Sequence, residues 1–205
     1  EIKLLKLFAK FIDKLFEVSL NEIEIYFKAK MQLKYLQGFD IVQLINERSF
    51  NTSPKLEKKL LNHIFKKNKK IFLLCCGVDY RSVNYAYQKK FRYSILTPYF
   101  ENNNLKKEYK EILKYLNNDY IKLSKFINKN ISGIISSDLD YHIPYKGTKK
   151  YIGMIANPVN TEILKNKTKK NHKKICILHA INSKNKIKKG NKFFQKSLDI
   201  LEKKY

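Results

Sequence analysis

Hydrophobic and polar residues in this chain follow two patterns: short unbroken apolar runs, and longer stretches with apolar residues at helical spacing. The clearest run, residues 71–76, carries six apolar or thiol side chains and ends at Gly77. A run this short and uniform is typical of a strand buried on both faces of a parallel sheet. Together with four other runs, it gives expected strands over residues 39–46, 71–76, 131–136, 151–156 and 175–180.

The stretches between the runs place apolar residues three and four positions apart, as amphipathic helices do. Ser53 followed by Pro54 is a typical helix start, because a serine hydroxyl caps free N–H groups and proline fits the first helical position. The expected helices cover residues 1–37, 54–65, 81–90, 105–116 and 120–130, and one more begins near residue 191. This alternation predicts an α/β fold, a Rossmann-like parallel sheet with helices on both faces.

The composition of the chain indicates its domain organisation. Residues 165–174 are almost all Lys, Asn, Thr and His, which is typical of a solvated linker. We expect a partial Rossmann-like domain over residues 1–160, a linker over 161–174, and the first strand, loop and helix of a second Rossmann-like domain over 175–205. The chain begins with Glu1 rather than Met and ends inside an expected helix, so we expect a fragment cut at both ends.

The chain is strongly basic, with a formal net charge of +25 from 43 Lys and Arg against 18 Asp and Glu. Only Arg48, Arg81 and Arg92 are arginines, although base reading and two-pronged phosphate binding prefer arginine. We therefore expect no specific nucleic-acid partner, but an attraction to anionic surfaces such as a membrane leaflet. A basic α/β protein that binds nucleic acid or a membrane remains an alternative class of function.

Cysteine usage and hydropathy indicate the compartment. The three cysteines are an odd number, which fits a reducing compartment, and without C-x-x-C spacing or a Cys/His cluster they predict no zinc site. No signal peptide or membrane-spanning apolar segment is recognisable. We expect a cytoplasmic protein, with peripheral contact at the inner face of the membrane.

Polar residues follow two of the expected strands. Asn46 and Glu47 stand at the end of the strand over 39–46, and Gly77, Asp79 and Tyr80 follow the next strand. Ligands of open α/β sheets bind outside the carboxyl ends of the strands, so these five residues are candidates for a binding site. Asp79 has a second interpretation, because an aspartate at this position can simply cap the following helix.

Five segments, taken in order, resemble bacterial glycosyltransferases of the two-domain GT-B fold, most closely the retaining, family-4-like members (glycosyl transferase group 1). They read FDIVQLIN, LLCCGVD, a strand ending near ISSD, YIGMIANPVN and ICILHAINSKNKIKKG. In such enzymes the N-terminal Rossmann-like domain holds the acceptor and the C-terminal domain holds the nucleotide-sugar donor. The resemblance implies transfer of a sugar from a nucleotide-diphosphate sugar to a saccharide or lipid-linked acceptor, as in polysaccharide biosynthesis, without a cofactor.

The resemblance also assigns residues. The segment over 155–160 looks like the hinge between the domains. LLCCGVD looks like a family strand that ends in His-Gly-x-Asp; Cys76 stands at the histidine position, while Gly77 and Asp79 match. Asp79 is therefore the candidate catalytic residue. Asn46, Glu47, Gly77, Asp79 and Tyr80 would line the acceptor side.

The donor diphosphate of the family is bound by a loop with the pattern G-R-x…K-G. Lys189 and Gly190 match its end, and Ser183 or Lys184 stands at the arginine position. The helix that begins after Gly190 would add its positive end to such a site. The family's Gly-rich first strand and its later carboxylate pair are missing, so the resemblance implies that this fragment is inactive alone.

Asp138-Leu139-Asp140 permits another interpretation. A D-x-D after a strand is the metal-binding signature of the other glycosyltransferase fold, GT-A, in which the carboxylates hold a divalent cation on the diphosphate. A metal-dependent GT-A-type transferase using Asp138 and Asp140 is therefore a further alternative. Capping of a turn or helix by Asp138 is the simpler explanation of the same residues.

Overall fold

A computed structural model describes residues 19–163, 177–181 and 186–204 of the chain. The chain divides into two compact units, one formed by Glu1–Tyr85 and Glu111–Ala156 and the other by Ala86–Lys110 and Asn157–Tyr205. The first unit contains the sheet and the residues expected on the acceptor side. The second contains the residues expected to bind the donor.

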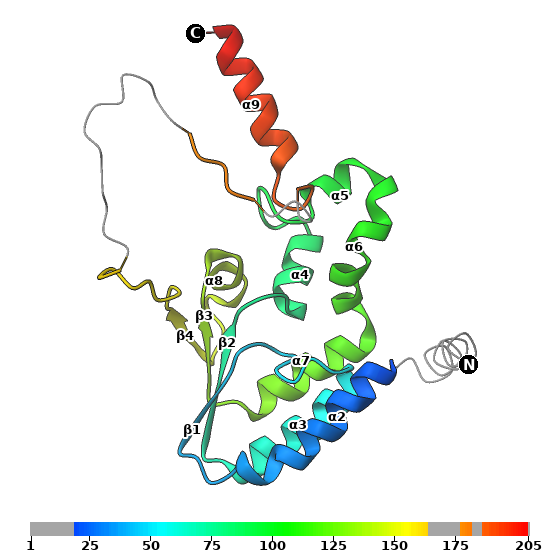
Figure 1. The fold of residues 1–205 in the computed structure, drawn as a ribbon, viewed down its shortest axis with the longest axis vertical. Coiled ribbons are helices and arrows are strands. Elements are labelled where there is room, and N and C mark those ends of the chain that lie inside the picture. The colour runs from blue at the N-terminus through cyan, green and yellow to red at the C-terminus, as the bar shows by residue number, and fades with distance from the viewer. Residues whose placement is uncertain (1–18, 164–176, 182–185, 205) are drawn as a thin grey trace. The chain divides into compact units, whose positions relative to one another are not determined.

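The first unit is built on a four-stranded parallel sheet in the order β1-β2-β3-β4 (Figure 1). The strands are β1 (Ile41–Leu44), β2 (Lys70–Cys75), β3 (Gly133–Ser136) and β4 (Tyr151–Met154). Four of the expected strands are thus confirmed; β1, β3 and β4 are shorter than their apolar runs, and β2 has the length of its run but begins one residue earlier. The parallel sheet confirms the α/β class.

Helices of the first unit precede β1 and fill the connections between the strands. They are α2 (Leu20–Gln32), η1 (Leu33–Tyr35), α3 (Pro54–Lys67), η3 (Lys114–Leu116), α7 (Asn118–Asn130) and α8 (Leu139–Tyr145), and α4 (Tyr80–Tyr87) runs across the boundary between the units. In Figure 1, α3 and α7 lie on the same side of the sheet, and α2 packs against α3.

The hydrophobic core lies on one face of the sheet. It is formed by Leu33, Leu44, Leu60, Leu61, Ile64, Ile71, Leu73, Cys75, Leu123, Ile127, Ile131, Ile134 and Tyr145. On the opposite face, Ile41 and Ile152 are 64% and 61% exposed. The described part of the chain therefore does not show the expected helices on both faces. Successive parallel strands joined by crossovers of one hand keep their helices on the same side.

The start of α3 is as predicted, but its cap is not the expected one. Pro54 opens the helix, yet the Ser53 hydroxyl makes no capping bond. The fully buried Glu57 binds the loop before the helix instead: its carboxylate accepts hydrogen bonds from Phe50 N at 2.8 Å, from Thr52 N at 3.0 Å and from Thr52 Oγ1 at 2.8 Å. A buried carboxylate thus organises the loop between β1 and α3.

Other departures lie at short elements. The helix expected over 81–90 ends at Tyr87, and residues 139–145, for which no helix or strand was predicted, form α8. Residues 177–180, the described part of the strand expected over 175–180, form no strand. A strand exists only when it pairs with a neighbour, and the described residues from 157 onward contain no other strand.

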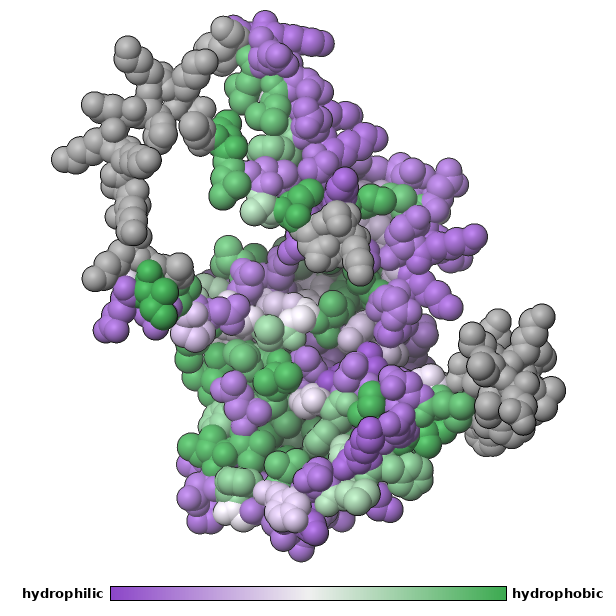
Figure 2. Space-filling model, in the orientation of Figure 1, coloured by the Kyte–Doolittle hydropathy of each residue, from purple (hydrophilic) through white to green (hydrophobic). Residues whose placement is uncertain are grey.

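The described residues of the second unit form helices joined by turns and irregular segments, without a strand. The unit contains α5 (Thr97–Glu101), η2 (Asn103–Leu105) and α9 (Asn191–Lys204), and α6 (Lys106–Leu113) runs across the boundary. Tyr109 is fully buried and lies 5.5 Å from Tyr99, ring centre to ring centre. α9 buries none of its residues, and Figure 2 shows hydrophobic side chains along one edge of this helix and hydrophilic ones along the other.

Candidate functional site

The candidate site lies at the carboxyl ends of β1 and β2. Glu47 follows β1 and Asp79 follows β2; their side chains are only 1% and 3% exposed. One oxygen of Glu47, Oε2, accepts a hydrogen bond from the backbone N–H of Tyr80 at 3.1 Å. This bond ties the loop after β1 to the loop after β2, so the two predicted clusters of polar residues form one structure.

Asp79 holds the start of α4. Its Oδ1 accepts a hydrogen bond from Ser82 N at 2.7 Å, as a helix-capping aspartate does. Its other oxygen, Oδ2, accepts a long hydrogen bond of 3.5 Å from the hydroxyl of Tyr145, the last residue of α8. The capping interpretation of Asp79 is confirmed. Its burial favours a positioning role at the site over direct contact with a substrate.

The remaining two candidates, Asn46 and Gly77, lie at the same edge. Gly77 has a φ of +92°, in the left-handed region that favours glycine, and a Cβ added there would lie 4.0 Å from Asn46 Nδ2. Asn46 Oδ1 accepts from Arg48 N at 2.7 Å, which fixes the turn after β1. All five residues expected on the acceptor side are therefore brought together.

Burial controls the protonation of the two carboxyl groups. It raises the pKa of Glu47 from 4.5 to about 8, with a further rise from the charge of Asp79; the Ser124 hydroxyl and the Tyr80 N–H oppose this rise. Burial also raises the pKa of Asp79, against hydrogen bonds from Ser82, Cys75 and Tyr145. Two carboxylates so close in a dry site cannot both ionise readily, so Glu47 is largely protonated at neutral pH.

In a purely structural pair of buried carboxyl groups, every oxygen is expected to be hydrogen-bonded. The Glu47–Asp79 pair differs at the second oxygen of Glu47. Oε1 makes no well-formed hydrogen bond within the described part of the chain, although the Ser124 hydroxyl lowers the pKa of the carboxyl. A protonated carboxyl group can donate as well as accept a hydrogen bond. Glu47 is thus able to hold a proton beneath the loop surface.

Tyr145 of α8 and Arg81 of α4 lie together beside the buried carboxyl groups. The Tyr145 ring is 1% exposed, and burial and the charge of Asp79 raise the pKa of its hydroxyl well above the ordinary value. Arg81 Nε donates to the carbonyl of Pro144 at 2.6 Å, and its guanidinium lies 5.1 Å from the centre of the Tyr145 ring. No motif or spacing in the sequence indicated Tyr145 or Ser124.

A groove of about 570 Å³ opens beside the buried pair. Three of its lining residues, Tyr80, Ser124 and Tyr145, also belong to the cluster around Glu47 and Asp79. Five further lining residues are cationic, namely Arg81, Lys125, Lys129, Lys149 and Lys150. The carboxyl edge of the sheet is therefore joined to a basic groove.

The donor-side candidates are only partly described. Lys189 and Gly190 lie in the turn over 186–190 that leads into α9; Lys189 is exposed, and Gly190 has a φ of +71°. Ser183 and Lys184 lie outside the described residues. Nearby, the His179 ring stacks on Phe194 of α9 with 3.9 Å between the ring centres.

The D-x-D segment forms the start of α8. Asp138 Oδ1 accepts from Leu139 N at 2.6 Å, so the capping explanation is confirmed. His142 Nδ1 lies 2.6 Å from the hydroxyl of Tyr151. Within the described ranges, no three His, Cys, Asp or Glu side chains gather as metal ligands would.

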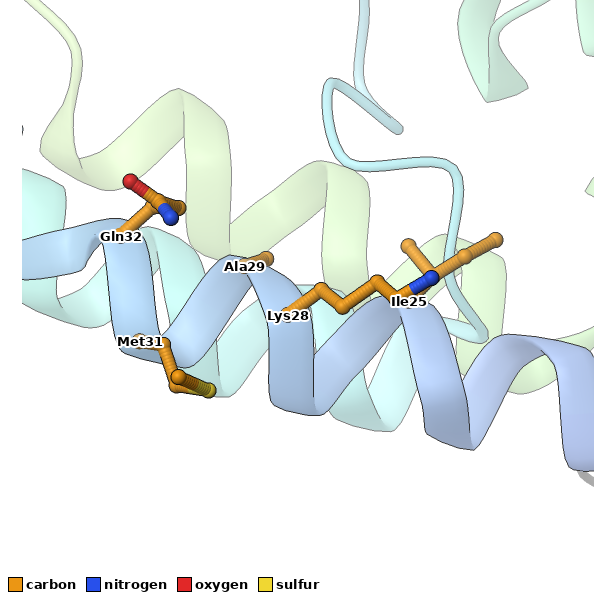
Figure 3. Close-up of a pocket in the computed structure, with 5 residues that line it drawn as sticks. All are labelled: Ile25, Lys28, Ala29, Met31 and Gln32. Carbon is orange, nitrogen blue, oxygen red and sulfur yellow. The ribbon is translucent and has the colours of Figure 1, made fainter.

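A second hollow, of about 440 Å³, lies on the surface of α2. Figure 3 shows that all its lining residues, Ile25, Lys28, Ala29, Met31 and Gln32, come from this one helix. Phe27 and Met31 are 56% and 71% exposed, so α2 presents apolar side chains as well as the exposed Glu24–Lys28 ion pair on its outer side. None of the helices that the structure describes has the length and hydrophobicity needed to cross a bilayer.

Comparison with protein families, with curated proteins and with solved structures finds no match.

Proposed function

We propose that this chain is part of a glycosyltransferase that moves a sugar from a nucleotide-diphosphate sugar to a saccharide or lipid-linked acceptor. The observation that carries the proposal is the gathering of Asn46, Glu47, Gly77, Asp79 and Tyr80 at one edge of a parallel sheet. The GT-B resemblance places the same five residues on the acceptor side, and open α/β sheets bind their ligands at this edge.

The buried carboxyl groups position the acceptor loops. Glu47 fixes the backbone of Tyr80, and Asp79 fixes the first turn of α4. Asn46, Gly77 and Tyr80 are more accessible and would contact the acceptor. Holding the acceptor in one orientation supplies a large part of the rate enhancement in group transfer.

On the donor side, Lys189 and Gly190, with Ser183 and Lys184, would hold the diphosphate. A nucleoside diphosphate leaves with a developing negative charge, which a lysine and the N-terminus of α9 can stabilise. The reaction would take place in the cytoplasm or at the inner face of the membrane and would need no cofactor beyond the nucleotide sugar.

A panel of nucleotide sugars tests this proposal on the intact protein that contains the chain. Release of nucleoside diphosphate from one of them is expected, and Lys189→Gln should raise the KM for that donor. Lys186→Gln, in the same turn and equally exposed, is the matched control and should leave the KM unchanged. Failure of every donor in the panel would contradict the proposal.

The net charge of +25 favours one other function, binding of nucleic acid or of a membrane surface. Nucleic-acid binding would show a steep dependence of affinity on salt, with a slope of several units on logarithmic axes. A GT-A-type enzyme that uses a metal at Asp138 and Asp140 would lose activity in the Asp138→Ala and Asp140→Ala variants. A GT-B-type enzyme would keep its activity in both variants, and Asp138→Ala would only remove the cap of α8.

A further inference from the structure

We propose that the basic groove, which we place between α7 and the turn before β4, binds a phosphate-bearing ligand. The inference goes beyond glycosyl transfer and does not depend on it. The groove is lined by the first turn of α4, by one side of α7, by the end of α8 and by residues 148–150, with Ile134 of β3 among them.

The groove concentrates positive charge beyond the average of the chain. Eleven residues line it, and at the overall frequency of 43 Lys and Arg in 205 residues about two would be cationic. Five are cationic and none is acidic. The five come from three separate segments, so the fold and not a local run of lysines assembles them.

Two of these cations have structural roles. Lys150 Nζ donates to the carbonyls of Asn128, Lys129 and Ile131 at 2.7, 3.1 and 2.6 Å, which closes the C-terminal end of α7. Arg81 Nε donates a hydrogen bond to the carbonyl of Pro144. The guanidinium has further N–H donors on its two terminal nitrogens, which would bind a ligand in the groove. The bonds to backbone carbonyls hold Arg81 and Lys150 in place among the lining residues.

The other three cations are available. Lys125, Lys129 and Lys149 are exposed and form no ion pair with another described residue. Lys125 and Lys129 stand four residues apart on α7, a spacing at which like charges repel each other. An anion between them would remove this repulsion.

The spread of the cations favours a ligand with more than one anionic oxygen group. A phosphate or diphosphate offers several acceptor oxygens to lysine and arginine donors, whereas a single carboxylate would engage only one part of the groove. Such a group can belong to a soluble phosphate ester or to a lipid headgroup. The chemistry at the groove is the same for both.

The test compares two double variants of the 205-residue chain. Each is titrated with inorganic pyrophosphate in a calorimeter, which measures the affinity and the stoichiometry. Lys125→Gln with Lys129→Gln removes two groove cations. Lys30→Gln with Lys34→Gln is the matched control, because it removes two exposed lysines at the same spacing from a surface outside the groove. We expect one pyrophosphate per chain and about tenfold weaker binding in the first variant only.

Vesicles of phosphatidylcholine with and without phosphatidic acid form the second arm. If the chain binds the acidic vesicles and the Lys125→Gln, Lys129→Gln double variant does not, the proposal is supported and the ligand is a lipid headgroup. This holds whether or not the chain also binds pyrophosphate. Binding of pyrophosphate alone supports it and assigns a soluble ligand. Absence of both, or an equal loss in the two double variants while circular dichroism shows both folded, would overturn the proposal.

Discussion

Replacing Glu47 with glutamine should make the stability of this protein less dependent on pH. Glutamine keeps an oxygen that can accept the hydrogen bond from Tyr80 N, which Glu47 Oε2 accepts at 3.1 Å, but it cannot ionise. In the native chain, burial raises the pKa of Glu47 from 4.5 to about 8. The unfolded chain therefore loses this proton near its ordinary pKa, while the folded chain keeps it until the pH approaches 8.

The sign of the effect follows from proton binding. Between these two pH values the folded state binds more protons than the unfolded state, so a rise in pH lowers the free energy of unfolding. At 1.36 kcal/mol per pH unit, a pKa shift from 4.5 to about 8 corresponds to about 5 kcal/mol as an upper limit, because opening of the site would relieve the burial. About 3.5 kcal/mol of it falls between pH 5 and pH 8.

Urea unfolding followed by far-ultraviolet circular dichroism measures this effect at about pH 5 and about pH 8. From the lower to the higher pH, the free energy of unfolding of the native chain should fall by up to about 3.5 kcal/mol more than that of the Glu47→Gln variant. At the lower pH the two proteins should have similar free energies of unfolding. Glu24→Gln, at an exposed residue of α2 that pairs with Lys28, is the control and should leave the pH dependence of stability over this interval close to that of the native chain. Equal pH dependence of Glu47→Gln and the native chain would refute the reasoning.

Two further predictions concern the cap of α3 and the cysteines. Ser53→Ala should change the free energy of unfolding by less than about 0.5 kcal/mol, because its hydroxyl caps nothing, whereas Glu57→Ala should cost about 3 kcal/mol or more through the loss of three hydrogen bonds to buried groups. Similar urea midpoints for the two variants would contradict this assignment. Cys76 is exposed and Cys75 is buried with a raised thiol pKa, so iodoacetamide followed by peptide mass spectrometry should find Cys76 modified and Cys75 protected in the folded chain. Equal modification of both would show that β2 is not buried as described.

The strands were predictable because their signal is local. The run over 71–76 is apolar throughout since its side chains lie in a parallel sheet, and five of its six residues lie in β2 (Lys70–Cys75). Cys75, the last residue of β2, is buried, whereas Cys76, the next residue along the chain, is exposed. Residues that follow two such strands could be expected at one edge, which is why Glu47 and Asp79 were found from the sequence.

Contacts that depend on the order of the strands were not predictable. Tyr145 lies 66 positions after Asp79 and reaches it because β3 lies between β2 and β4, an order that no spacing in one sequence reveals. α8 was missed because it is short and contains Pro144, which argues against a helix by propensity. The role of Glu57 was missed because a glutamate in the first turn of a helix is ordinarily solvent-exposed.

The central claim is that the edge around Tyr80 is the acceptor side of a glycosyltransferase. Its most direct test is acceptor-dependent release of nucleoside diphosphate by the intact protein and by its Tyr80→Ala variant, with saccharide and polyprenyl-phosphate-linked saccharide acceptors. The substitution leaves the scaffold in place, because Glu47 binds the backbone N–H of residue 80 and not its ring. The account predicts release that an acceptor accelerates, with kcat/KM for the acceptor about tenfold lower in the variant and an unchanged KM for the donor. No release from any nucleotide sugar, or an effect of Tyr80→Ala on the donor KM alone, would contradict it.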